Sequence, residues 1–154
     1  MLFCCLAFII ASNANAAKQL PVPRFAAIKF NEVNARTGPA SDCPIEWVFV
    51  KKGEPVEIVA EYGHWRKIRD IASEGGWVHS SVLSGKRSVV VTAKGTSPLL
   101  EGIAEYKKIV VYLEQNIRCV LQKCKKDWCK IDCKSHKGWI SRKALWGVYP
   151  DEHP

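Results

Sequence analysis

The sequence has 154 residues and a formal net charge of +8 at pH 7, from 23 Lys and Arg against 15 Asp and Glu. The basic excess is not a tail: residues 17–93 hold eleven basic and eight acidic groups, and residues 94–154 hold twelve and seven. Such a balance favours anionic partners in general. The basic residues form no compact stripe, and together with the export predicted below this argues against nucleic-acid binding.

Residues 1–16 are expected to be a signal peptide. Leu2 to Ala11 is apolar and uncharged, and Ala14-Asn15-Ala16 places small residues where a signal peptidase cuts. The apolar part falls well short of the roughly 20 residues of a membrane span, and no later run is longer, so no transmembrane segment is predicted. No Lys or Arg precedes it, and the alternative is a buried N-terminal strand or helix. We therefore expect a periplasmic or secreted protein.

The remaining chain consists of short β-type segments separated by turn signals. A β-branched run at 45–50 is followed by the Gly-Glu-Pro turn at 53–55, and 56–62 alternates with period two. Gly63-His64 marks a tight turn before a strand at 65–69, and Gly75-Gly76 precedes another strand. Short strands at this spacing predict an all-β barrel, which a strand at 88–92 would close.

The second half of the chain repeats the first. Gly63 to Ile68 aligns with Lys126 to Ile131 at a spacing of 63, and Gly76-Trp77-Val78-His79 aligns with Gly138-Trp139-Ile140-Ser141 at 62. The repeat predicts domains at 25–93 and 94–150. In the first, the expected core residues are Ile45, Trp47, Val56, Ile58, Trp65, Ile68, Trp77, Val78 and Leu83.

The first copy resembles the bacterial SH3-like (SH3b) domains. Residues 33–40, Val-Asn-Ala-Arg-Thr-Gly-Pro-Ala, are similar to the opening motif of that family. The family's Gly-x-Pro-Val turn, Trp-x-x-Ile strand and closing Gly-Trp-Val are matched at 53–56, 65–68 and 76–78. The resemblance implies two tandem small SH3-like barrels, in an arrangement similar to exported two-copy proteins of proteobacteria.

The second copy departs from this pattern at its start. Ser97-Pro98-Leu99 stands where Asn34-Ala35-Arg36 stands in the first copy, whereas Trp128 and Gly138-Trp139-Ile140 are retained. The fold is expected to be shared, and ligand binding at the first loop is expected only in the first copy.

Four cysteines lie within fifteen residues of the second copy, a density that predicts disulfides in an exported protein. Cys124 and Cys129 would face each other across a hairpin, and Cys119 would lie nearly opposite Cys133, one residue out of register. We favour these two bridges over a tetrahedral zinc site, since no Cys-x-x-Cys knuckle is present. Cys43 is left as a free thiol or one that pairs between molecules.

No catalytic arrangement, cofactor or metal is predicted. Cys43 and one of the four histidines could form a nucleophile and base, as in the cysteine peptidase domains that often accompany SH3-like domains. The two repeats leave no room for a separate peptidase domain, and no motif for an orienting group or oxyanion site is visible.

The resemblance places Trp65 and Trp77 beside the loops that line the family's ligand groove. Tyr62, His64 and Arg36 are their expected neighbours, and the candidate binding residues are Arg36, Tyr62, Trp65, Trp77 and His79. An aromatic floor with one cation suits an extended peptide or glycan. The competing interpretations are that the tryptophans pack in the core and that Arg36 braces the first loop.

The expected function is therefore a non-catalytic binding module that recognises peptidoglycan or a protein peptide at the cell envelope. The alternative is a structural adaptor or scaffold between proteins, with no ligand in the groove. These hypotheses differ in whether the predicted site residues gather on one exposed concave surface.

Overall fold

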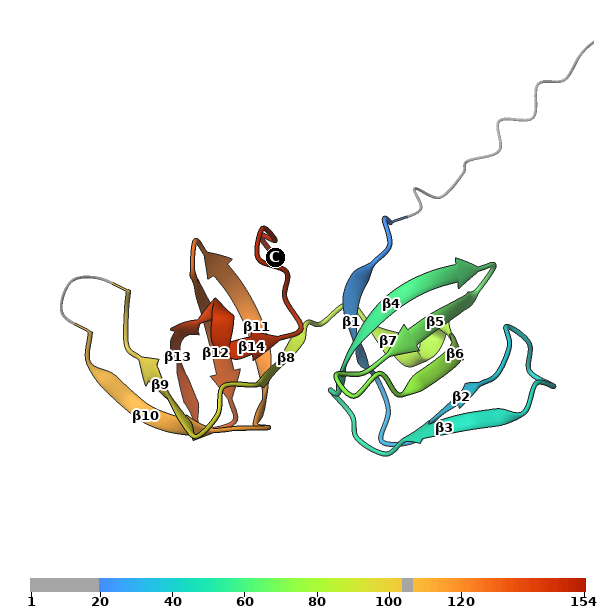
Figure 1. Ribbon diagram of the computed structural model, residues 1–154, viewed down its shortest axis with the longest axis horizontal. Coiled ribbons are helices and arrows are strands. Elements are labelled where there is room, and N and C mark those ends of the chain that lie inside the picture. The colour runs from blue at the N-terminus through green and yellow to red at the C-terminus, as the bar shows by residue number, and fades with distance from the viewer. Residues whose placement is uncertain (1–19, 104–106) are drawn as a thin grey trace, which may run out of the picture.

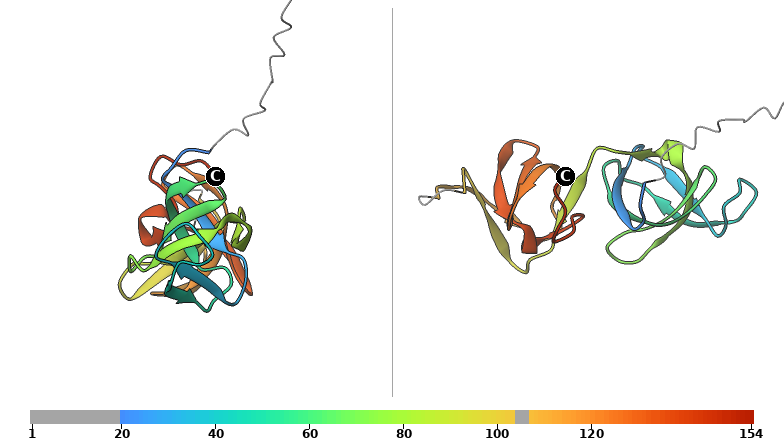
Figure 2. Two further views of the ribbon diagram at one scale, coloured as in Figure 1. Left: turned by 90° about the vertical axis from the view of Figure 1, so that its right-hand side faces the viewer. Right: turned by 90° about the horizontal axis from the view of Figure 1, so that it is seen from above.

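The computed structural model describes residues 20–103 and 107–154, and the predicted signal peptide lies outside them. These residues form two seven-stranded antiparallel sheets, each curled into a small barrel, and the barrels lie side by side (Figure 1). The C-terminal segment lies between the barrels in Figure 1 and in the right-hand view of Figure 2, which is seen from above. Within the described ranges no helix is long and apolar enough to cross a membrane.

The first barrel contains seven strands and the 3-10 turn Ser80–Val82. The strands are β1 (Arg24–Ile28), β2 (Val33–Arg36), β3 (Ile45–Phe49), β4 (Pro55–Tyr62), β5 (Trp65–Arg69), β6 (Gly75–His79) and β7 (Leu83–Ser84).

The second barrel repeats this set, with the 3-10 turn Arg142–Ala144. Its strands are β8 (Ser88–Val91), β9 (Thr96–Leu100), β10 (Ile109–Glu114), β11 (Arg118–Lys125), β12 (Trp128–Cys133), β13 (His136–Ser141) and β14 (Leu145–Trp146).

The two sheets have the same topology. The strand order is β3-β2-β6-β5-β4-β1-β7 in the first and β10-β9-β13-β12-β11-β8-β14 in the second, so each strand has a counterpart seven strands later. The predicted all-β class and the two tandem SH3-like barrels are confirmed.

The prediction that residues 88–92 close the first barrel is wrong. β8 pairs with β11 and β14 of the second sheet, just as β1 pairs with β4 and β7 of the first. The predicted boundary after residue 93 therefore separates β8 from the sheet to which it belongs. A valine-rich strand carries no local signal of which sheet it will join, because that depends on pairing with distant strands.

Each barrel has its own core of small aliphatic side chains. Val56, Ile58, Ile68 and Val78 are buried in the first barrel, as predicted. The expected tryptophans are not: Trp47 is 37% exposed and Trp65 and Trp77 are half-buried, while Ile45 is 49% exposed. The core instead includes residues from β1, β2 and β3: Ala26, Ile28, Val33, Ala35 and Phe49.

Strands that meet the other barrel are buried on both faces. All four residues of β8 are buried, as are the first four residues of β4, including Glu57. β4 and β8 contact each other across the gap between the barrels. A strand with one solvent-exposed face is expected to alternate buried and exposed side chains. This alternation is lost in β4 and β8 because the other barrel covers the outer face.

Candidate functional site

The outer face of β5 and β6 carries the residues predicted for recognition. Trp65 is the register partner of His79, and Lys67 is the partner of Trp77. Partners in an antiparallel pair point to the same side of the sheet. Ile68 and Val78, which alternate with these residues, are buried in the core, so Trp65, Trp77 and His79 face outward.

His79 organises one end of this face. Its ring lies 5.8 Å from the ring of Trp65, edge to face, and 5.7 Å from the ring of His64. The Ser81 N–H donates to His79 Nδ1 over 3.3 Å, and Ser81 Oγ lies 2.7 Å from the same nitrogen. His79 therefore caps the 3-10 turn that follows β6, while its ring edge remains exposed.

Tyr62 and Arg36 extend the face in two directions. Tyr62 is the partner of Trp65 across the β4–β5 hairpin and is 67% exposed. Arg36 is the partner of Trp77 on the other side of β6. Its Nη1 donates to the carbonyl oxygen of Cys43 over 2.8 Å, so the side chain braces the loop between β2 and β3.

Gly76 allows β6 to approach β2 closely enough for this arrangement. Its φ of +138° is rarely adopted by other residues, and a Cβ there would lie 2.6 Å from the carbonyl oxygen of Arg36. Gly138 plays the same part in the second barrel, where a Cβ would lie 2.6 Å from the carbonyl oxygen of Leu100. The Gly-Trp motif therefore holds each tryptophan beside the strand equivalent to β2.

The second barrel presents a different outer face. Leu100 is the partner of Trp139, so it occupies the position of Arg36, and the sequence alignment that put Leu99 there was one residue out. Lys107 Nζ lies 4.2 Å from the ring centroid of Trp128, and Lys123 Nζ lies 5.9 Å from that of Trp139. A lysine thus lies over each of these two rings, and among the described residues no basic side chain lies over Trp65 or Trp77 in this way.

The four clustered cysteines form the two predicted disulfides, Cys119–Cys133 and Cys124–Cys129. Cys124 and Cys129 are register partners on β11 and β12. A bulge between Leu121 and Lys123 shifts the register by one residue, and this brings Cys119 opposite Cys133. The sulfurs are therefore occupied, and the described residues contain no cluster suited to a metal ion. Cys43 is a free thiol.

Contacts between the barrels gather around Phe25 of β1. Its ring packs edge to face on the ring of Trp146, with 5.0 Å between centroids. It also lies tilted against the ring of Tyr149, at 4.6 Å. The hydroxyl of Tyr149 donates to Glu57 of β4 over 2.6 Å. Arg118 of β11 donates to both carboxylate oxygens of Glu54, each over 2.9 Å. A bidentate ion pair and an aromatic cluster thus join the two barrels.

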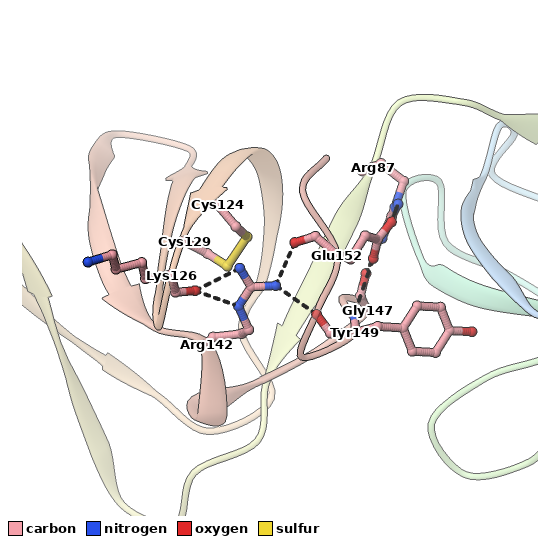
Figure 3. Close-up of a disulfide and its surroundings, with 8 residues drawn as sticks. All are labelled: Arg87, Cys124, Lys126, Cys129, Arg142, Gly147, Tyr149 and Glu152. Carbon is pink, nitrogen blue, oxygen red and sulfur yellow. Dashed lines mark hydrogen bonds and ion pairs between the residues drawn. A yellow bond between two sulfur atoms is a disulfide. The ribbon is translucent and has the colours of Figure 1, made fainter.

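Two arginines, Arg142 and Arg87, hold the C-terminal segment in this contact (Figure 3). Arg142 is 7% exposed and donates to the carbonyl oxygens of Lys126, Tyr149 and Glu152. Arg87 donates to the Glu152 carboxylate and, over 2.7 Å, to the carbonyl oxygen of Gly147.

These contacts shift two pKa values. Burial, together with the hydrogen bond to Glu57, raises the pKa of the Tyr149 hydroxyl. Burial opposes ionisation of Glu152, but hydrogen bonds from Arg87 and from the Tyr149 N–H outweigh it and lower the pKa of the Glu152 carboxyl. The two shifts favour a protonated Tyr149 hydroxyl and an ionised Glu152 carboxylate, which are the states that make these hydrogen bonds.

Comparison with known proteins identifies the fold family. A model of the bacterial SH3 domain matches residues 29–85 and again residues 93–147, most of the chain. The chain belongs to the bacterial SH3 domain family. The two matched segments correspond to the two barrels without the first strand of each. β1 and β8 both end before their match begins.

One curated relative is YrvJ of Bacillus subtilis (strain 168), a protein named provisionally as an N-acetylmuramoyl-L-alanine amidase. It is 26% identical over 152 residues, which cover 92% of this chain but only 29% of YrvJ. Two solved structures, NlpC2 and NlpC1 from Trichomonas vaginalis, are 14% and 15% identical, with TM-scores of 0.38 and 0.37. This chain covers 51% and 48% of them, over 87% and 84% of its own length.

The paired bacterial SH3 domains thus place all five predicted recognition residues on one outer face of the first domain. They form two rows: Tyr62, Trp65 and His79 in one, and Arg36 and Trp77 in the other. Two hollows among the described residues, one between the barrels and one beside Lys67 and Gly75-Gly76, are lined by other residues.

The residues that join the two SH3 domains were not predicted from the sequence. Glu54 and Glu57 looked like ordinary surface carboxylates, and Arg118 and Arg142 looked like two of many scattered basic residues. The one local signal was the stretch from Trp146, at the end of β14, to Tyr149, for which no role was predicted.

Proposed function

We propose that this protein is a non-catalytic module that binds peptidoglycan, or a peptide at the cell envelope, through the outer face of its first bacterial SH3 domain. The observation that carries the proposal is the outward row of Tyr62, Trp65 and His79 beside Trp77. Aromatic side chains on a sheet face give large contact area at low entropic cost, which suits an extended glycan or peptide.

Family membership and the amidase name of YrvJ support a role at the cell wall. The two disulfides support a location outside the cytoplasm, where such bonds persist. The predicted signal peptide at 1–16 would supply the export.

The arrangement of the thiols supports a non-catalytic role. Four cysteines are consumed in disulfides, and the remaining Cys43 lies in the loop between β2 and β3. His64 lies in the turn between β4 and β5, and His79 is the last residue of β6. Their rings are neighbours, and among the described residues no contact joins either of them to Cys43. A nucleophile needs an activating base within hydrogen-bond reach.

A binding assay with purified cell wall tests the proposal. The protein should be retained at moderate salt, and the double variant Trp65→Ala with Trp77→Ala should lose retention. The matched control is Trp128→Ala with Trp139→Ala, which removes the equivalent rings of the second domain. Failure of the unaltered protein to be retained would rule out the peptidoglycan version. Equal loss in both variants would contradict a site confined to the first domain.

The scaffold alternative rests on a separate observation. β3 and β10 each form one edge of their sheet, and both expose apolar side chains. These are Ile45, Trp47, Val48, Ile109, Val110 and Tyr112, each at least 37% exposed. An apolar edge strand is a ready surface for pairing with another protein. Capture of an envelope protein that is lost on Val48→Lys, but kept by the Trp65 and Trp77 variant, would favour this function.

A further inference from the structure

A groove of about 640 Å³ lies between the two barrels, away from the outer face described above. One wall comes from the end of β1 and the turn before β4, and the other from the start of β11 and the turn between β12 and β13. The segment that links the barrels, residues 84–88, forms its back. The volume falls in the range of about 300–1,000 Å³ that is usual for ligand sites.

The groove is strongly basic. Six basic residues line it and only one acidic residue, Asp132, does so; the basic residues are Lys29, Lys52, Lys86, Arg87, Arg118 and Lys134. Glu152 and Glu54 neutralise the two arginines, and Lys137 lies 3.1 Å from Asp132. None of the four lysines has an ion-pair partner among the residues that the structure describes.

Two polar atoms in the same groove also lack a partner. Ser88 is only 5% exposed, yet its hydroxyl has no hydrogen bond to another described residue. The Nε–H of Arg87, the preceding residue, is buried and equally unsatisfied. A buried donor without an acceptor is costly, so the segment that holds these two atoms, at the edge of the groove, is a strained part of its lining.

We propose that this groove binds a ligand with several phosphate groups, such as a soluble phosphorylated polymer. Four unpaired ammonium groups supply positive charge from several directions, which suits a tetrahedral, multiply charged oxyanion. A planar carboxylate is better matched by the fork of an arginine, and both arginines here already hold carboxylates.

Calorimetric titration of the full chain with tripolyphosphate at low salt tests the site. The variant Lys52→Gln with Lys134→Gln should weaken binding about tenfold or more, because each ammonium contributes at close range. The matched control is Lys125→Gln with Lys143→Gln, which removes the same charge from exposed positions outside the groove and should change the affinity less than about twofold, as screened distant charges do. Equal weakening by the two variants would overturn the proposal.

Two further comparisons identify the ligand class, and a second measurement locates it. Citrate, a tricarboxylate, should bind more weakly than tripolyphosphate, and equal affinity would overturn the phosphate assignment. Binding only to vesicles of anionic phospholipid, with none to tripolyphosphate, would overturn the choice of a soluble ligand. Amide chemical-shift changes in the unaltered protein should concentrate at residues 84–88 and 118–120. Changes confined to other residues would likewise overturn the site.

Discussion

Arg66 and Glu61 form an ion pair across the β4–β5 hairpin, with 2.7 Å between Nε and Oε1. They are register partners in the first barrel, at the place where Cys124 and Cys129 are partners in the second. The equivalent hairpins of the two barrels are therefore cross-linked at the same position, by an ion pair in the first barrel and by a disulfide in the second. Glu61 also pairs with Arg24, so the charged version is a small network.

This equivalence predicts that a disulfide can be transferred between the copies. A chain with Glu61→Cys and Arg66→Cys should form a third disulfide under oxidising conditions, because the backbone geometry at that hairpin already holds one in the second barrel. Counting free thiols by alkylation and mass spectrometry would measure it. Expressed without residues 1–16, which hold Cys4 and Cys5, the chain should retain a single reactive thiol, Cys43. Three reactive thiols would show that the hairpins are not equivalent.

Loss of the native disulfides should destabilise the second barrel more than the first. Replacing Cys119 and Cys133 by Ala should lower the free energy of unfolding by about 2–4 kcal/mol, and by less for Cys124 and Cys129, because the smaller loop constrains the unfolded chain less. Hydrogen exchange resolves the two barrels separately. Equal loss of protection in β4 and β11 would instead show that the barrels unfold as one unit.

Gly76→Ala should lower the free energy of unfolding by about 1–3 kcal/mol, because the new methyl group would approach the Arg36 carbonyl at a strained φ. Gly85→Ala is the matched control, since a Cβ at that position meets nothing within 4 Å. Urea denaturation followed by tryptophan fluorescence would compare them. Similar midpoints for the two variants would contradict the close approach of β6 to β2.

The Arg118–Glu54 pair should couple the two barrels energetically. A double-mutant cycle with Arg118→Gln and Glu54→Gln should give an interaction free energy of about 0.5–3 kcal/mol in urea denaturation, as expected for residues in direct contact. Arg118→Gln alone should be the more damaging change, because it leaves the buried Glu54 carboxylate without its partner. Additive effects of the two substitutions would show that the barrels are not held in this contact.

Alkaline pH should weaken the contact made by Tyr149. Its pKa is raised in the folded protein above the ordinary value of 10.0, so the stabilisation is complete below pH 10 and is lost as the pH rises further. Tyr149→Phe lacks the hydroxyl and should be less stable than the unaltered protein at pH 8, with a smaller further loss above pH 10. Denaturant midpoints measured across this pH range would decide, and parallel curves for the two proteins would contradict the shift.

Acid should act on Glu152 in the opposite sense. Its pKa is lowered in the folded protein, so its stabilisation is complete above the ordinary value of 4.5 and is lost as the pH falls through the folded pKa. Glu152→Gln should remove that part of the acid dependence. Thermal unfolding between neutral and acid pH would measure the difference, and an unchanged acid profile in the variant would contradict it.

The sequence by itself determined the fold class, the duplication and the disulfide pairing. These follow from local patterns: period-two strands, a repeated Trp-x-x-Ile and Gly-Trp motif, and cysteines placed across one hairpin. The family resemblance also named Tyr62, Trp65 and His79 together, and the strand register, which depends on short turns, aligns them in one row.

Only the tertiary structure decided what the two barrels cover. The packing of the two barrels decides which strand faces are covered. It sets the sheet partner of β8, the burial of Glu54 and Glu57, and the surface position of Trp65 and Trp77. The basic groove has the same origin, since Lys29 and Lys134 lie more than a hundred residues apart in the chain. Local patterns report alternation along one strand, whereas burial on both faces comes from packing between distant segments.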